Sequence, residues 1–93
     1  MSFECYFSSE EIVKFFDSYF RQCAWESSYL EVESRNTHHY WMIIKDPSAD
    51  VPYTLLHKYQ RWHPYHHQCR CANFNSVIRK IKKHDSYVLR KSR

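Results

Sequence analysis

Histidine and cysteine are concentrated in one short segment of the chain, between residues 63 and 71. Imidazole nitrogen and thiolate sulfur are ligands that zinc prefers, and four of them arranged as a tetrahedron complete a structural site. A small core also gains stability from a bound metal, because the binding energy becomes folding energy. The sequence therefore predicts a structural zinc ion in this segment. The candidate ligands are His63, His66, His67, Cys69 and Cys71.

The sequence leaves open which four residues would bind the metal. Cys69 and Cys71 are separated by one residue rather than by the commoner two, and either Cys5 or Cys23 could replace a histidine. A surface loop with solvated histidines and two buried thiols is the alternative interpretation. A catalytic zinc is not expected, because positions 51–84 contain no acidic residue that could act as a base beside the metal.

The chain contains no glycine, which excludes several kinds of catalytic site. Phosphate-binding loops, dinucleotide fingerprints and nucleophile elbows need glycine where the backbone approaches a ligand closely or takes a positive φ. We therefore expect a protein that is not an enzyme. His57 shares one face of a predicted strand with Tyr53, Leu55 and Tyr59 and is expected to be a core or rim histidine.

Charge is divided unevenly along the chain. Residues 1–51 contain four Lys or Arg and nine Asp or Glu, and residues 52–93 contain ten and one, so net charges of −5 and +9 add to the stated +4. The asymmetry predicts a nucleic acid or another acidic surface as partner of the C-terminal half, unless the two halves neutralise each other. The basic candidates for phosphate contact are Arg79, Lys80, Lys82 and Lys83.

Aromatic residues lie just before the basic segment and are candidates for partner contact. Exposed aromatic rings can stack on nucleic-acid bases or anchor a protein interface. The candidates are Tyr59, Trp62 and Tyr65.

The hydropathy pattern predicts a single α+β domain over residues 1–93, with the order α-β-β-β-α and both helices packed on one face of an antiparallel sheet. A capping box formed by Ser8 and Glu11 begins the first helix. Asn36 is expected to take the left-handed conformation in the first hairpin turn. The predicted elements are a helix over 9–24, strands over 29–34, 39–45 and 52–62, an irregular loop over 63–72, a helix that begins near 73 or 75, and a tail over 86–93 that adds a short strand at 87–89 or frays.

The sequence also favours a cytoplasmic protein. No apolar run is long enough to span a membrane, and the first residues lack the charged and apolar regions of a signal peptide. In a reducing compartment the four cysteines are expected to be thiols or metal ligands rather than disulfides.

The predicted α-β-β-β-α order is similar to that of the double-stranded-RNA-binding domain. That resemblance implies phosphate contacts from basic residues of the second helix, a role that falls here to the four candidates between Arg79 and Lys83. The family carries a Gly-Pro-x-His loop between its first two strands. His38 and His39 lie at the corresponding place, without the glycine and proline.

In size and composition the chain also resembles the small anti-CRISPR proteins of phages and mobile elements that inhibit Cas9. The resemblance implies a stoichiometric inhibitor that binds a bacterial CRISPR nuclease in the cytoplasm of the bacterial host and blocks loading of target DNA. Acidic residues such as Glu26, Glu31 and Glu33 would then face a basic surface of the nuclease.

Overall fold

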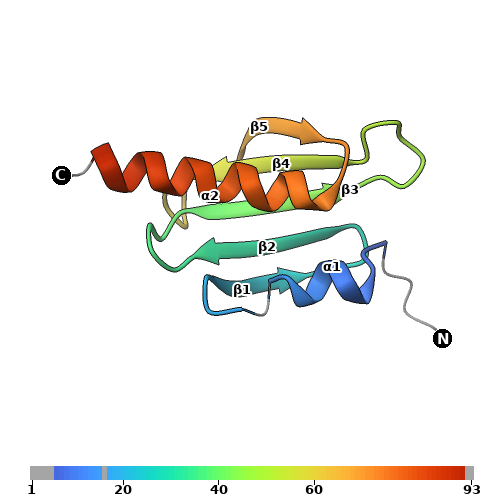
Figure 1. Ribbon diagram of the computed structural model, residues 1–93, viewed down its shortest axis with the longest axis horizontal. Helices are drawn as coiled ribbons and strands as arrows, with labels where there is room; N and C mark the ends of the chain where they lie inside the picture. The colour runs from blue at the N-terminus through green and yellow to red at the C-terminus, as the bar shows by residue number, and fades with distance from the viewer. Residues whose placement is uncertain (1–5, 16, 92–93) are drawn as a thin grey trace.

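A five-stranded antiparallel sheet forms the centre of the protein, and both helices lie against the same face of it (Figure 1). The computed structural model describes residues 6–15 and 17–91. The strands follow one another across the sheet in chain order, so that β1 and β5 form its two edges. The fold is α+β, as predicted, with five strands where three were expected. The elements are α1 (Ser9–Val13), β1 (Phe20–Trp25), β2 (Tyr29–Ser34), β3 (Tyr40–Lys45), β4 (Tyr53–Lys58), β5 (His66–Cys71) and α2 (Phe74–Lys91).

The core lies between the helices and the sheet. Side chains of a strand alternate between its two faces, and every second residue of β3 and β4 points toward α2. Trp41, Ile43 and Leu55 are completely buried in this way. Val77 and Ile81 of α2 are also completely buried and meet them from the other side. Burying each large aliphatic side chain contributes about 1.5–3 kcal/mol to folding.

Glu11 attaches α1 to the sheet. The predicted capping box is confirmed, since the Ser8 backbone N–H donates to Glu11 Oε1 at 2.8 Å and the Glu11 N–H donates to Ser8 Oγ at 3.2 Å. The same carboxylate accepts a hydrogen bond from Lys45 Nζ at 2.7 Å and another from the Tyr53 hydroxyl. The first turn of α1 is therefore held to both β3 and β4.

The predicted helix over 9–24 is wrong beyond its first turns. α1 ends at Val13, and residues 20–25 form β1, which pairs with β2. The strand still places Phe20 in the core, with 2% of its surface exposed, while β2 supplies hydrogen-bond partners for the backbone. Phe16, which falls within the helix predicted over 9–24, lies outside the described residues.

The predicted irregular loop over 63–72 is wrong for residues 66–71, which form the edge strand β5. Its register with β4 shifts by one residue, so that Cys69 lies opposite Leu55 while His66 lies opposite His57. The extra residue is a β-bulge, which changes the face to which the following side chains point. β4 itself is shorter than the strand predicted over 52–62.

α2 continues to Lys91, so the predicted short strand at 87–89 is also wrong. Asp85 explains why the helix continues, because its buried carboxylate accepts hydrogen bonds from the Tyr19 hydroxyl at 2.6 Å and from Thr37 Oγ1 at 2.9 Å. These bonds hold the second half of α2 against the turns that flank β1 and β2. Neither of the helices described here is both long and apolar enough to cross a membrane.

The turn between β2 and β3 takes its left-handed residue from a different position than predicted. His38 has φ 62°, and it is the one residue with positive φ in the described part of the chain. Its backbone N–H donates to the carbonyl of Ser34 at 2.8 Å, and its Nδ1 lies 3.0 Å from Glu33 Oε2. These contacts hold the turn at His38 without a glycine, and the prediction for Asn36 was wrong.

Replacing Glu11 by glutamine should make the fold less sensitive to acid. Burial raises the pKa of the Glu11 carboxyl, but hydrogen bonds from Lys45 and Tyr53 outweigh burial and hold that pKa below 4.5. Glu11 therefore stabilises the fold above about pH 4.5, and this contribution is lost as the pH falls through the lowered pKa. Urea unfolding at pH 7 should show that Glu11→Gln is less stable by about 1–2 kcal/mol. The difference between the two proteins should shrink at pH 3.

The control is Glu10→Gln, which changes an exposed carboxylate in the same turn. That variant should keep the acid sensitivity of the wild type. The prediction is contradicted if Glu11→Gln and the wild type lose the same free energy of unfolding between pH 7 and pH 3.

Candidate metal centre

Three histidines from three different parts of the chain meet between α2 and the sheet. His39 lies directly before β3, His57 lies on β4 and His84 lies on α2. One ring nitrogen of each lies within 4.8 Å of those of the other two. Within residues 6–15 and 17–91, this is the one group of three or more histidine, cysteine or acidic side chains close enough to hold a metal ion. We call these three residues the histidine cluster.

Aromatic rings hold the histidine cluster in place. Trp41 is completely buried and lies opposite His57 in the β3–β4 ladder, with ring centres 4.5 Å apart. The ring of His84 meets Trp41 edge-on at 5.0 Å. Tyr59 packs edge-on against His39 at 4.9 Å and against His57 at 5.0 Å. Each imidazole is therefore oriented by its packing before any ion binds.

The separation of two of the rings suits a shared metal ion. His39 Nδ1 and His57 Nε2 lie 3.0 Å apart, which one N–H···N hydrogen bond also satisfies. Two nitrogen ligands of a tetrahedral zinc ion lie about 3.3 Å apart, because each Zn–N bond is about 2.0 Å long. A small movement of the two rings would therefore convert their hydrogen bond into a pair of metal bonds.

The third ring carries an unsatisfied nitrogen. Nδ1 of His84 is buried and has no hydrogen-bond partner in the described structure. An unpartnered buried polar atom costs about 1–3 kcal/mol, and such atoms are uncommon in folded proteins. A metal ion bound through Nδ1 would give this nitrogen a partner. The histidine cluster therefore fits a metal ion in its donor type, in its spacing and in this missing contact.

His66 lies directly behind the histidine cluster, where it can form a hydrogen bond with His57. Its Nε2 lies 3.4 Å from His57 Nδ1, on the side of the ring away from His39. A histidine that binds a metal through one nitrogen usually donates a hydrogen bond from the other, which fixes the orientation of the ring. His66 is placed to accept that bond from His57.

The environment keeps the cluster neutral. Burial, together with repulsion of a positive charge by the neighbouring His84, His39 and His66, lowers the pKa of His57 to about 3. Burial likewise lowers the pKa of His39 and that of His84. Neutral imidazole is the form that binds metal, so the ligands are ready to bind at neutral pH without losing a proton.

The five ligands predicted from the sequence do not form one site. His63 is exposed in the turn before β5, and His67 lies opposite Leu56, on the face of the sheet away from the helices. The sulfur atoms of Cys69 and Cys71 lie 3.9 Å apart on the face toward α2. Because side chains of a strand alternate between its two faces, His67 and the two cysteines of β5 point to opposite sides of the sheet. Of the five, His66 contacts the histidine cluster, with its ring beside that of His57.

The two alternative cysteine ligands do not complete a site either. Cys23 lies exposed on β1, at the opposite edge of the sheet from β5. Cys5 lies outside the described residues.

Sequence reasoning missed the histidine cluster because its members are far apart in the chain. His39, His57 and His84 are separated by 18 and 27 residues, and no local spacing connects them. The expected core or rim position of His57 is confirmed, since 1% of its surface is exposed. A weaker signal was available on α2, because His84 follows Ile81 by three residues and so continues the apolar face of the helix.

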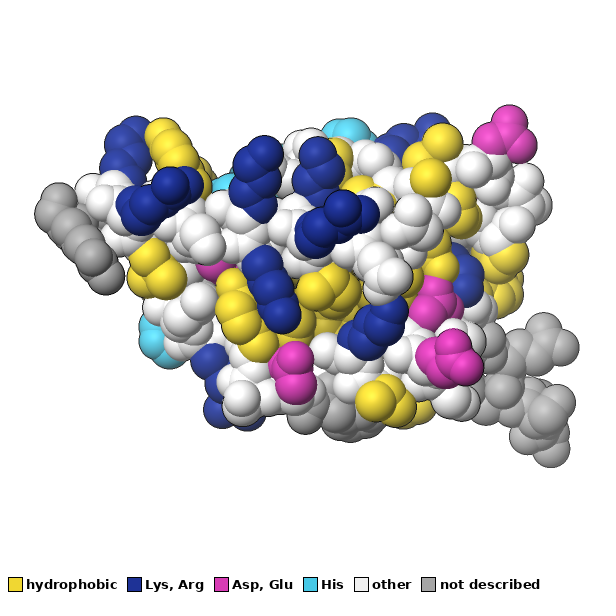
Figure 2. Space-filling model, viewed as in Figure 1, with side chains coloured by type: hydrophobic (Ala, Val, Ile, Leu, Met, Phe, Trp, Pro, Cys, Tyr) yellow, Lys and Arg dark blue, Asp and Glu magenta, His cyan; other side chains and the backbone are white. Residues whose placement is uncertain are grey.

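The residues predicted to contact a partner lie on three different surfaces. Tyr59 and Trp62 line a groove beside the cluster, and 78% of the surface of Trp62 is exposed. Tyr65 lies instead against Lys58 and donates a hydrogen bond to Glu31 Oε2 at 2.5 Å. The basic candidates lie on the outer side of α2, where Figure 2 shows Lys and Arg side chains in a row. They are Arg79, Lys80, Lys82 and Lys83.

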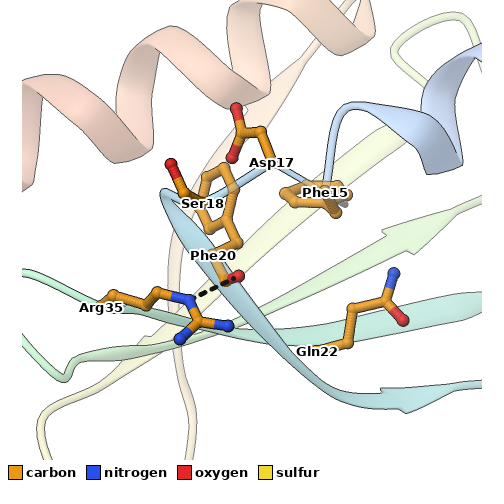
Figure 3. A pocket seen from close by; sticks show the side chains of 6 residues that line it. All are labelled: Phe15, Asp17, Ser18, Phe20, Gln22 and Arg35. Carbon is orange, nitrogen blue, oxygen red and sulfur yellow. Dashed lines mark hydrogen bonds between the residues drawn. The ribbon is translucent and has the colours of Figure 1, made fainter.

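A hollow beside β1 is separate from these surfaces (Figure 3). Arg35 crosses it and donates a hydrogen bond from Nε to the carbonyl of Phe20 at 3.1 Å. The lining has no imidazole or thiol, and Asp17 is its one carboxylate. The lining residues are Phe15, Asp17, Ser18, Phe20, Gln22 and Arg35.

Known proteins provide no template for this centre. No family model matches the chain, and no curated protein or solved structure matches it. The five-stranded sheet also departs from the three-stranded order on which the likeness to the double-stranded-RNA-binding domain depended. The resemblance to anti-CRISPR proteins stays a prediction.

Zinc or cobalt should bind the metal-free protein and stabilise it. A ligand present at a hundred times its dissociation constant adds about 2.7 kcal/mol to the free energy of unfolding. For a domain of this size that corresponds to a rise of roughly 10 °C or more in the unfolding temperature. The measurement is thermal unfolding after chelator treatment, with zinc, cobalt or magnesium added.

Two variants locate the site. His84→Ala should lose the response to zinc, whereas His67→Ala should respond as the wild type does, because His67 lies on the other face of the sheet. The visible spectrum of the cobalt-loaded wild type provides a second readout if His84→Ala does not fold. Failure of both metals to bind the wild type would contradict the assignment.

Proposed function

We propose that this chain is a non-enzymatic nucleic-acid-binding domain that contacts phosphates through α2, and that a structural zinc ion in the histidine cluster holds α2 on the sheet. The observation that carries the proposal is the charge on the outer side of this helix. All of its basic side chains are exposed, and its one acidic residue, Asp85, is completely buried on the opposite side. The basic residues are Arg79, Lys80, Lys82, Lys83, Arg90 and Lys91.

Within the described residues, no ion pair joins the acidic N-terminal half to the cations of α2. The ion pairs formed within residues 6–15 and 17–91 involve cations that lie outside α2. Lys82 lies over the ring of Tyr19 at 5.0 Å rather than beside a carboxylate. Arg79 has its hydrogen bond with Ser76. The positive charge of α2 is therefore available to a partner outside the protein.

The length of α2 suits a polyanion. Its 18 residues extend over about 27 Å, since each residue of an α-helix adds about 1.5 Å. Double-stranded DNA carries one phosphate charge for about every 1.7 Å along its axis, so a helix of this length can face several phosphates. Lys80, Lys83 and Arg90 also border one pocket between α2 and β5, which concentrates their charge.

A zinc ion would act here as a structural link. Three neutral imidazoles match the ligand preference of zinc, and they would join His39 and His57 of the sheet to His84 of the helix. The only carboxylate next to the cluster in sequence, that of Asp85, is engaged by Tyr19 and Thr37. This arrangement favours stabilisation by the metal over catalysis.

Inhibition of a bacterial CRISPR nuclease stays a prediction, and the observed contacts favour it less. Glu33 is 8% exposed and already bound by Arg21 and His38. Glu31 accepts the hydrogen bond from Tyr65. Two of the carboxylates expected to face a basic surface of the nuclease are therefore occupied within the protein, whereas no ion pair of the described residues involves a cation of α2. A DNA-cleavage assay with excess protein would test inhibition directly.

Removing charge from α2 should weaken binding to nucleic acid and flatten its salt dependence. The triple variant Lys80→Ala, Lys83→Ala, Arg90→Ala should lower the slope of log affinity against log salt concentration by roughly 2–3, because each phosphate contact contributes about 0.9. Fluorescence anisotropy with a labelled oligonucleotide between 50 and about 300 mM salt measures this slope.

The matched control exchanges the same residues without changing charge, as Lys80→Arg, Lys83→Arg, Arg90→Lys. This variant should keep most of the affinity and the slope of the wild type. An alanine variant that binds as tightly as the wild type at every salt concentration would refute the proposal.

A further inference from the structure

We propose that the groove between Tyr59 and Trp62 stacks an unpaired nucleobase, so that the nucleic acid bound by this protein is single-stranded. The inference rests on the proposed function and adds the class of nucleic acid. The groove lies where the β4–β5 turn faces the residues that precede β3, and it encloses about 610 Å³. His39 of the histidine cluster also lines it.

Two aromatic rings give the groove its chemistry. Trp62 has 78% of its surface exposed, the largest fraction among the exposed large hydrophobic residues of the described chain, and Tyr59 has 55% exposed. Leaving this much apolar surface in water is unfavourable, and concentration of aromatic rings at one groove marks a binding surface. Bases of every kind have a flat π-face, so such rings bind single-stranded nucleic acid with little sequence preference.

The groove is ordered before any ligand binds. The ring of Tyr59 is held edge-on by His39 and His57, both of which are buried. The turn that carries Trp62 is braced by Lys58 Nζ, which donates to the carbonyl of Arg61 at 2.8 Å. A second hydrogen bond in the turn joins the His63 N–H to the carbonyl of Gln60 at 3.0 Å. A base would therefore meet a preformed platform, and little ordering would oppose its binding.

The charge of the residues that line the groove favours an anionic ligand such as a nucleic acid. None of the residues that line it carries a carboxylate, and Arg61 supplies a cation at its edge, whereas His38 is already engaged by Glu33. The aromatic face would hold the base while Arg61 contacts the neighbouring phosphate. A duplex cannot use this groove, because its bases are stacked inside the double helix.

The groove and α2 can contact one strand together. The β4–β5 turn and the C-terminal end of α2 lie at the same end of the molecule (Figure 1). The two surfaces are also joined through the histidine cluster, where the rings of His39 and His84 lie 5.5 Å apart. A strand whose phosphates follow the cations of α2 toward Arg90 therefore approaches the groove.

The test compares a labelled 12-nucleotide oligothymidylate with a 12-base-pair duplex at one salt concentration. Wild type should bind the single strand more tightly. Trp62→Ala should weaken single-strand binding by at least about fivefold, the lower bound for loss of one stacked base, and leave duplex binding unchanged. Trp62→Phe should restore most of the loss, since phenylalanine can still stack. The matched control is Trp25→Ala, which changes a partly exposed tryptophan on β1, at the far edge of the sheet.

The outcomes separate the inference from the proposed function. If single strand and duplex bind equally well and Trp62→Ala changes neither affinity, base stacking in the groove is refuted, while phosphate binding by α2 stands. Salt-dependent binding of neither oligonucleotide would refute both. If the groove instead binds a protein, Trp62→Ala leaves both nucleic-acid affinities unchanged, which also overturns the inference.

Discussion

Buried polar nitrogen atoms need a hydrogen-bond partner or a metal ion inside the protein. The histidine cluster places such nitrogens at the junction of α2 with the sheet. His39 and His57 partly satisfy this need by bonding to each other, while Nδ1 of His84 remains without a partner. Burial lowers the pKa of all three imidazoles, which favours the neutral form that binds a metal ion. The arrangement of the helix on the sheet is thus tied to what occupies the space between these rings.

The same junction determines which residues face outward. Two neighbouring residues of α2 point into the protein. His84 lies in the cluster, and Asp85 accepts hydrogen bonds from Tyr19 and Thr37. Because these inward contacts set the rotation of the helix, its basic side chains lie on the solvent side. Tyr59 packs on the opposite side of the cluster and thereby shapes the aromatic groove. One set of buried contacts therefore positions both of the surfaces to which we assign binding.

Local sequence patterns predicted those features of the fold that depend on interactions between residues close in the chain. The α+β class and the capping box that begins at Ser8 followed from hydropathy and cap residues, and both are confirmed. The edge strands β1 and β5 were missed, because pairing with a neighbouring strand decides their conformation and their own sequences alternate weakly. The histidine cluster was missed for a related reason: the β3–β4 register and the packing of α2 bring together residues that share no motif. Of the ligands predicted between His63 and Cys71, His66 contacts the histidine cluster.

The bulge between β4 and β5 gives the adjacent pair His66 and His67 a meaning that their spacing does not reveal. In the observed register His66 lies opposite His57, and His67 lies opposite Leu56. If the ladder ran from Cys69 without the extra residue, His67 would lie opposite His57 instead. Either alignment of this edge strand therefore presents an imidazole to His57. Two histidines in succession therefore keep an imidazole opposite His57 whether or not the strand takes up the extra residue as a bulge.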